Sequence, residues 1–280
     1  MNDKNTIISY CNKRVHKEWN RLKRYRMEFD VTKKIFSNYF FQPPADICDI
    51  GGGPGRYSFY LSEQGYNVTL VDIAKANINY AKKIAIKKKI HLKNYIVSDA
   101  TDLSMIHSNK YDIVLLMGPI YHLITENERE KSIKEAYRIL RSGGIIIVSF
   151  VSRYERLRYL AEYEPRYLSV NKQTVYGLLK TGIMVGSTKL DNGKESFTTA
   201  YYAHPKEINS LMNKCNFQQL SIHGLEVIMS KPYNTKMAKL KSETWENWVD
   251  LNYYLSMEDN LLESSDHLIY VGKKNGNKIL

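Results

Sequence analysis

The chain has 280 residues and a mass of 32.6 kDa, which suits one large α/β domain or one domain with a substantial insertion. It carries 41 Lys and Arg against 29 Asp and Glu, and this net charge of +12 reflects either a solvated basic surface or a phosphate-rich partner. Three scattered Cys, no apolar leader and no membrane-length apolar run exclude a disulfide-rich secreted domain and predict a cytoplasmic protein with no membrane partner.

Residues 6–40 predict two helices ahead of the first core strand. Apolar side chains recur at three- and four-residue steps from Ile8 to Phe29, with Lys and Arg between them. The apolar content continues to Tyr39, and Pro43 and Pro44 end it. We treat residues 1–44 as a helical N-terminal extension that packs one face onto the rest of the domain.

A glycine turn follows the first short apolar run of the core. The sequence D-I-G-G-G-P-G-R-Y occupies residues 49–57 and precedes a helix-compatible segment that Gly65 ends. Glycines at alternate positions let the backbone approach a ligand, and the next helix offers free N–H groups to an anion. A dinucleotide fingerprint needs a third glycine where Arg56 stands, which argues against NAD or FAD.

Two acids at the ends of the next strands extend this candidate ligand site. The strand predicted at 67–71 ends in Asp72, whose carboxylate can accept both hydroxyls of a ribose. The strand predicted at 94–97 leads to Asp99, which can accept an adenine amino group beside the backbone N–H of Ala100.

The fourth predicted strand, 111–116, runs into M-G-P-I-Y-H-L at 117–123. Gly118 and Pro119 turn the backbone out of the strand at the carboxyl edge of the sheet, where ligands of open α/β sheets bind. Tyr121 and His122 are therefore expected close to the reacting group.

The alternation of strand and helix from 46 to 150 predicts a parallel doubly wound sheet. Thr125 and Glu128 predict a capping box for a helix that ends near Gly143 and Gly144. The remaining predicted elements are a strand at 145–150, a helix from Pro205, a strand at 217–222, a helix from Ser242 and a strand at 267–271.

The glycine turn followed by a strand-end acid resembles motif I of the class I methyltransferases that bind S-adenosylmethionine (SAM). The resemblance covers most of the chain through five further runs: M-G-P-I-Y-H-L (117–123), R-I-L-R-S-G-G (138–144), S-R-Y (152–154), A-Y-Y-A-H-P (200–205) and S-D-H-L-I-Y-V-G-K-K (265–274). These runs resemble one bacterial subgroup that carries G-P-x-Y-H-L after the fourth strand. A Glu-Gly pair expected at 224–227 is replaced by Gly-Leu-Glu-Val, which leaves the role of Glu226 open.

The resemblance implies a Rossmann-like α/β fold with a seven-stranded, mostly parallel sheet, a SAM-binding core at 45–150 and a C-terminal part at 205–280 that carries a second helical insertion. It also implies a set of SAM contacts: Tyr10, Asp49, Gly51, Gly53, Gly55, Arg56, Asp72, Ile73, Asp99, Ala100 and Met117. Tyr10 is included because an N-terminal helix closes over SAM in many members; plain packing of that helix is the alternative.

Residues 151–204 are too many for a simple connection and predict a cap over the substrate. Aromatic walls with a few Arg suit a flat or anionic acceptor, and we assign substrate contacts to Arg153, Tyr154, Tyr201 and His204. Two alternatives remain for this segment. It is either a basic helix and hairpin packed on the domain edge, or a surface for single-stranded nucleic acid.

The chemistry that follows is methyl transfer, in which the protein aligns the acceptor with the methyl group and excludes water. His122 is the leading general base because its neutral form is available at pH 7; capping of the turn is the alternative. Tyr121 would orient the acceptor, and His204 is a second candidate base. No acidic cluster with metal spacing occurs near the strand ends, so no metal is expected.

The predicted function is SAM-dependent methylation of O, N or S on a small-molecule acceptor. An RNA methyltransferase is the first alternative, so nucleic acid is kept as a less favoured partner. The second alternative is a SAM-binding regulator or partner subunit without catalysis.

Overall fold

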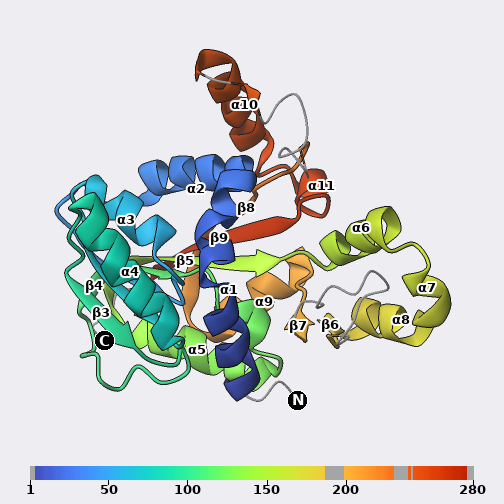
Figure 1. Cartoon of the computed structure of the whole chain (residues 1–280), viewed down its shortest axis with the longest axis horizontal. Coiled ribbons are helices and arrows are strands. Elements are labelled where there is room, and N and C mark those ends of the chain that lie inside the picture. The colour runs from blue at the N-terminus through green and yellow to red at the C-terminus, as the bar shows by residue number, and fades with distance from the viewer. Residues whose placement is uncertain (1–3, 187–198, 230–238, 241, 276–280) are drawn as a thin grey trace.

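The structure is a computed structural model that describes residues 4–186, 199–229, 239–240 and 242–275. A seven-stranded sheet forms its centre, in the order β3-β2-β1-β4-β5-β9-β8 (Figure 1). Within this sheet β9 runs antiparallel to both β5 and β8, and the other neighbouring pairs are parallel. The expected class I methyltransferase architecture, a seven-stranded and mostly parallel sheet, is confirmed.

The sheet and the helices that connect its strands have the following bounds: β1 (Asp46–Ile50), α3 (Arg56–Glu63), β2 (Asn67–Asp72), α4 (Lys75–Lys88), β3 (Asn94–Val97), β4 (Tyr111–Leu116), η1 (Ile120–His122), α5 (Glu126–Ile139), β5 (Leu140–Val151), α9 (Pro205–Lys214), β8 (Phe217–Gly224) and β9 (His267–Lys274). The elements outside the sheet layers are α1 (Lys4–Arg24), α2 (Arg26–Tyr39), α6 (Arg153–Tyr163), α7 (Tyr167–Val170), α8 (Lys172–Thr181), β6 (Ile183–Met184), β7 (Ala200–Tyr201), α10 (Ser242–Leu255) and α11 (Asp259–Leu262).

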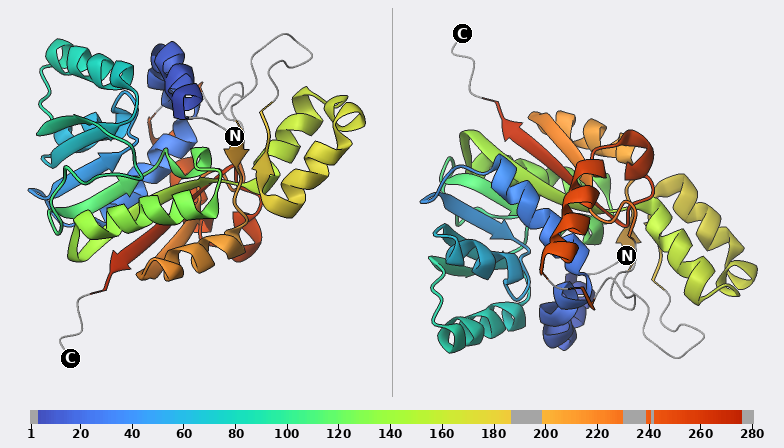
Figure 2. Two further views of the ribbon diagram at one scale, coloured as in Figure 1. Left: turned by 90° about the horizontal axis from the view of Figure 1, so that it is seen from below. Right: turned by 90° about the horizontal axis from the view of Figure 1, so that it is seen from above.

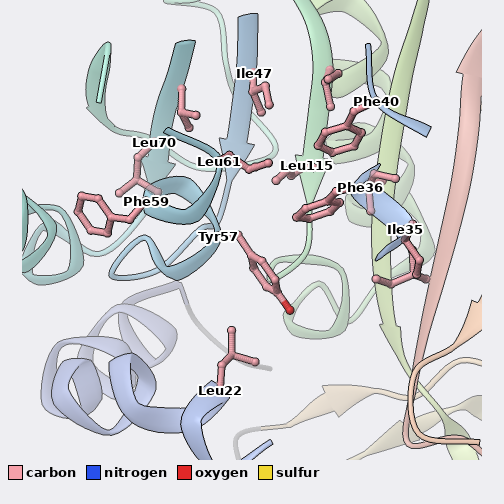
Figure 3. Packing of buried hydrophobic residues seen from close by; sticks show 14 of the residues in the cluster. Leu22, Ile35, Phe36, Phe40, Ile47, Tyr57, Phe59, Leu61, Leu70 and Leu115 are labelled. Atoms are coloured by element: carbon pink, nitrogen blue, oxygen red, sulfur yellow. The ribbon is translucent and has the colours of Figure 1, made fainter. Parts of the chain in front are cut away.

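Alternation along the strands sends side chains into two apolar layers. On β1, Ile47 faces the layer formed with α1 to α4 and α10, whereas Cys48 and Ile50 face the layer formed with α5 and α9. Figure 3 shows the first layer, where Phe36 of α2 and Leu61 of α3 lie against the sheet. The ends of β1, β2 and β4 are therefore held by cores on both faces of the sheet.

The boundary between α5 and β5 differs from the prediction. The expected helix end near Gly143 and Gly144 is wrong, because α5 ends at Ile139 and β5 begins at Leu140. A Cβ on Gly144 would lie 2.9 Å from the backbone oxygen of Asp112. Gly144 therefore serves the close approach of β5 to β4, where the register shifts, and Gly143 has a φ of 75° within β5; neither is the helix C-cap. The capping box of Thr125 and Glu128 is confirmed.

Helices α6, α7 and α8 lie to one side of the sheet, together with the two short strands β6 and β7 (Figure 2). They enclose a small apolar cluster of their own. The predicted cap at 151–204 includes residues 187–198, which lie outside the described residues. Helix α1 lies between α4 and this group of helices (Figure 1). Of the helices described, none has both the length and the apolar character needed to cross a membrane.

Candidate active site

A cavity of about 990 Å³ opens at the carboxyl ends of the parallel strands. This volume lies near the upper end of the roughly 300–1,000 Å³ typical of ligand pockets, which leaves room for a cofactor and a second small molecule. One face of α1 forms a wall of the cavity, with residues at helical spacing: Lys4, Ile7, Cys11, Arg14, Glu18 and Arg21. The other walls include the loops after β1 to β4, the turn η1, the start of α6, and residues of α2, β5, β7 and β9.

The glycine turn forms the floor of one end. Gly51 and Gly53 have φ of 68° and 58°, in the left-handed region that favours glycine. A Cβ on Gly53 would meet nothing closer than 3.8 Å, so this position opens toward the cavity. Gly55 does not line the cavity. It is the N-cap of α3 with φ of 86°, and a Cβ there would lie 3.2 Å from Leu70 and Phe59, which assigns it to packing.

Asp49 and Asp72 lie beneath and beside this turn, and both are buried. The Ser58 hydroxyl donates to Asp49 at 2.6 Å; burial nevertheless raises the pKa of Asp49 to about 6, and the Asp72 charge adds to the rise. The Asp72 carboxylate accepts from the backbone N–H of Gly53 at 2.8 Å and from the Asn77 amide at 3.1 Å. Asp72 thus shapes the turn as well as facing the cavity.

Asp99 lies at the cavity wall after β3 and joins α1 to the sheet edge. Its carboxylate accepts from the backbone N–H of Thr101 and forms an ion pair with Lys4 on the first turn of α1. Burial alone would raise the pKa of Asp99, but Lys4 and the Thr101 donors outweigh it and lower the pKa below its usual range. Ala100 lines the cavity beside it.

The remaining predicted cofactor residues also border the cavity. Tyr10, Arg56, Ile73 and Met117 all line it. The Arg56 guanidinium lies 5.0 Å from the ring centroid of Trp19, which is itself buried in the core. Each of these residues remains a predicted rather than a demonstrated cofactor contact.

Tyr121 and His122 stand on η1, where the backbone leaves β4, and both line the cavity. Their ring centroids are 4.7 Å apart. Burial lowers the pKa of His122 to about 4, so its imidazole is neutral at pH 7. The pKa of Tyr121 is raised, chiefly by burial and also by the charge of Glu18, so its hydroxyl keeps its proton.

The four predicted substrate contacts do not line the cavity and gather around a different group. The Arg153 guanidinium forms an ion pair with Glu207 at 2.6 Å, and the Tyr201 hydroxyl donates to the same carboxylate at 3.0 Å. His204 is the N-cap of α9 in a capping box with Glu207, and the Tyr154 ring lies 6.0 Å from the His204 ring. These residues connect the 151–204 segment to α9 and lie outside the cavity, and their contact with a substrate stays a prediction.

Neighbouring residues on the same two elements line the cavity instead. Glu155, Arg156 and Tyr159 face it from α6, and Tyr202 faces it just after β7. The predicted residues and the cavity-lining residues share the same segments but lie on different faces, because the phase of α6 and of a two-residue strand depends on tertiary packing. One signal was available: S-R-Y-E at 152–155 has the spacing of a capping box, which marks the start of α6 and hence its phase.

A buried network of charges lies near Glu155 and Tyr202, at the end of the cavity opposite the glycine turn. This network was not predicted from the sequence. Glu28 forms two 2.6 Å bonds with the Arg21 guanidinium, and His267 Nδ1 lies 2.9 Å from Glu226. Burial opposes a charged His267, but Glu226 and Glu28 outweigh it and raise the pKa of His267 to about 10. Glu226, whose role the sequence left open, thus pairs with a cationic histidine.

One side-chain oxygen or nitrogen atom from each of Glu28, Glu226 and His267 lies within 4.8 Å of the other two, a spacing that could also suit a metal ion. The Glu28 carboxylate is bonded to Arg21, and the charges of Glu226 and Glu28 stabilise the protonated form of His267. A metal ion requires a neutral imidazole. These three residues therefore fit an ion-pair network better than a metal centre.

The residues around the glycine turn suit SAM. Carboxylates are present for ribose hydroxyls at Asp72 and for an adenine amino group at Asp99, and the glycine turn admits a close backbone approach. Asn77 Oδ1 and Arg56 Nε are buried at the cavity wall with no hydrogen-bond partner among the described residues. Such atoms are costly unless a ligand or water satisfies them.

Comparison with known proteins agrees with this geometry. Residues 48–148 match the family model described as a methyltransferase domain. A ubiquinone biosynthesis O-methyltransferase from Rickettsia bellii is 26% identical over 242 residues, covering 86% of this chain and 86% of the relative.

Two solved structures share the fold at low sequence identity. A SAM-dependent methyltransferase from Methanosarcina mazei has a TM-score of 0.59 at 20% identity, covering 87% of this chain and 98% of that one. The 1,6-didemethyltoxoflavin-N1-methyltransferase of Burkholderia thailandensis, solved with S-adenosylhomocysteine, has a TM-score of 0.58 at 11% identity, covering 96% of this chain and 87% of that one.

Proposed function

We propose that this chain, a SAM-dependent methyltransferase with the class I fold, methylates a hydroxyl oxygen of a small-molecule acceptor. The observation that carries the proposal is the single cavity, in which the glycine turn lies at one end, His122 borders the space, and an end walled by Tyr159 and Tyr202 is left for an acceptor. The O-methyltransferase name of the Rickettsia bellii relative favours oxygen over nitrogen or sulfur.

The cofactor supplies an electrophilic methyl group on a sulfonium, which becomes neutral when the carbon–sulfur bond breaks. We assign Asp72 and Asp99 to the ribose and adenine of SAM, with Gly51 and Gly53 providing the backbone approach. Tyr10 would close over the cofactor from α1. Met117 continues the cavity wall into the loop after β4, and Tyr121 and His122 on that loop would then border the acceptor.

His122 is the proposed proton acceptor. With its pKa lowered to about 4 it is a weak base, but it is neutral at pH 7, as a proton acceptor must be. A weak base is sufficient here, because the hydroxyl proton becomes strongly acidic as the new oxygen–carbon bond forms. Tyr121, held in its neutral form, can donate to the acceptor and orient it.

An acceptor screen tests this function. Purified protein is incubated with SAM and panels of small hydroxylated, amino and thiol compounds, and S-adenosylhomocysteine release is measured. Release with hydroxylated compounds supports the proposal. Release only with amines or thiols would mean that the methylated atom is nitrogen or sulfur instead of oxygen. Release that requires RNA, with RNA binding that weakens steeply with salt, would replace the small-molecule acceptor by nucleic acid. Binding of SAM without release on any panel would favour a non-catalytic role.

A further inference from the structure

Helix α6 begins with the sequence of a capping box that the structure does not form. In S-R-Y-E, at 152–155, the Ser152 hydroxyl accepts from the backbone N–H of Tyr154, as a cap should. The Glu155 side chain would complete the box by accepting from the Ser152 N–H, but that N–H donates to the backbone oxygen of Asp266 at 2.9 Å. The boxes at the starts of α5 and α9 are both complete, so this is a specific departure.

Glu155 faces the cavity instead of capping its helix. Its side chain is half-buried and lines the acceptor end together with Tyr159, four residues later on the same helix face, and Tyr202. No described residue donates a hydrogen bond to its carboxylate or forms an ion pair with it. A carboxylate in this position is solvated by water until a ligand that donates a hydrogen bond displaces that water.

The charged groups around Glu155 are already engaged with other partners. Arg158 forms an ion pair with Asp266 at 2.6 Å, and His267 is bonded to Glu226. Arg156 lies 5.0 Å from the Tyr159 ring centroid and donates to the Met184 sulfur. Burial raises the pKa of Glu155 to about 7 and Asp266 adds to the rise, while His267, Arg156 and Arg158 oppose it. Tyr10, Tyr159, Tyr167 and Tyr202 are further titratable groups on this side.

This environment favours one kind of ligand group. The charges around the carboxylate are mixed, because Asp266 acts on it more strongly than any one of His267, Arg156 and Arg158. A protonated amine would bring a charge that must be desolvated in this partly buried site, whereas a neutral donor provides a hydrogen bond without that cost. The tyrosine rings beside it offer apolar faces to a flat molecule.

We propose that Glu155 anchors the acceptor: its carboxylate accepts a hydrogen bond from a neutral hydroxyl of an aromatic molecule that lies beside Tyr159 and Tyr202. This hydroxyl is distinct from the oxygen that is methylated, so the acceptor carries at least two. Glu155 is thus a specificity-determining residue and takes no part in proton transfer. The inference rests on the proposed function, because it places the acceptor at this end of the cavity.

The test uses binding rather than turnover. The full chain, saturated with S-adenosylhomocysteine, is titrated by NMR with catechol, with its dimethyl ether 1,2-dimethoxybenzene, and with benzylamine. We expect catechol to bind wild type at least tenfold more tightly than the ether, and E155Q to lose this difference. E155D should retain part of it. E162Q, on an exposed position of the same helix, is the matched control and should behave as wild type.

A second readout follows the carboxyl itself. With carbon-13 label on glutamate, the Glu155 signal is identified by its loss in E155Q, and it should titrate with a midpoint near pH 7. Catechol should lower that midpoint, because a donor stabilises the charged form, and the ether should not.

Three results would overturn the proposal: no catechol binding to wild type, equal binding by E155Q, or a preference for benzylamine. These results are separate from failure of the proposed function. If E155Q weakens catechol binding while no small molecule is methylated in the screen, Glu155 still binds the hydroxyl. The proposed methylation of a small molecule is then rejected.

Discussion

The two ends of the cavity are built in different ways. At the cofactor end, Asp49, Asp72 and Asp99 each lie at or directly after the carboxyl end of a parallel strand, so local sequence determines where they lie. At the acceptor end, Glu28 comes from α2 and His267 from β9, and these segments meet only through tertiary packing. The difference teaches that a strand-end motif predicts a cofactor site, whereas an acceptor site depends on how helices are rotated.

The largest effect is expected from replacing His122, the proposed proton acceptor. His122→Ala should lower kcat on a hydroxylated acceptor about 10²- to 10⁴-fold, the usual contribution of a general base. The dissociation constant for SAM should change little, because the proposed cofactor contacts are untouched. His107→Ala, an exposed histidine outside the cavity, is the control. Unchanged turnover in His122→Ala would remove this residue from the mechanism.

Loss of the charge network should destabilise the acceptor end and the whole fold. Arg21→Ala leaves the buried Glu28 carboxylate without its bidentate partner, and this should lower the free energy of unfolding by about 3–5 kcal/mol. Lys23→Ala, exposed on the same helix, should change it by less than about 0.5 kcal/mol. Urea denaturation measures both. Equal stability of the two variants would mean that the network does not hold this end together.

A smaller effect is expected from adding a side chain to the glycine turn at Gly53. Gly53→Ala places a Cβ at φ of 58° and into the cavity, which should weaken SAM binding about tenfold through backbone strain of about 1–2 kcal/mol and lost space. Gly177→Ala is the matched control, because its Cβ would meet open space within α8. The control should stabilise the protein by up to about 1 kcal/mol and leave SAM binding unchanged. Equal SAM affinity in both variants would argue against a close backbone approach at Gly53.

The last prediction concerns pH. The folded-state pKa of His267 lies at about 10, above its unfolded value near 6.5, so its contribution to stability is complete below pH 6.5 and lost as pH rises toward 10. The melting temperature should therefore fall between pH 7 and 10. His267→Gln should melt at a lower temperature at pH 6.5 but show a shallower fall. Parallel curves for the two proteins would contradict the assigned pKa.

Much of the cofactor end was predictable because its residues are fixed by strand ends. The order of strand, glycine turn and helix placed Gly51, Gly53 and Asp72 at one cavity wall without knowledge of the tertiary structure. Gly55 was the exception in this region. Its neighbours Leu70 and Phe59 are core residues that the turn motif alone does not reveal.

The acceptor end was predicted only to the level of the segment. Tyr201 and Tyr202 are adjacent, yet one packs against Arg129 and Glu207 and the other faces the cavity. A short strand specifies no register of its own, so the choice between the two was open. The same ambiguity on α6 led the prediction to Arg153, whereas Glu155 is the residue that lines the cavity.

The division of the cavity into two independent ends is tested most directly by titrating S-adenosylhomocysteine into wild type, Asp72→Asn and Glu155→Gln by calorimetry. The account predicts that Asp72→Asn weakens binding by about 10- to 100-fold, the loss of hydrogen bonds to a charged group, and that Glu155→Gln binds as wild type does. Equal weakening in both variants, or unaltered binding by Asp72→Asn, would contradict it.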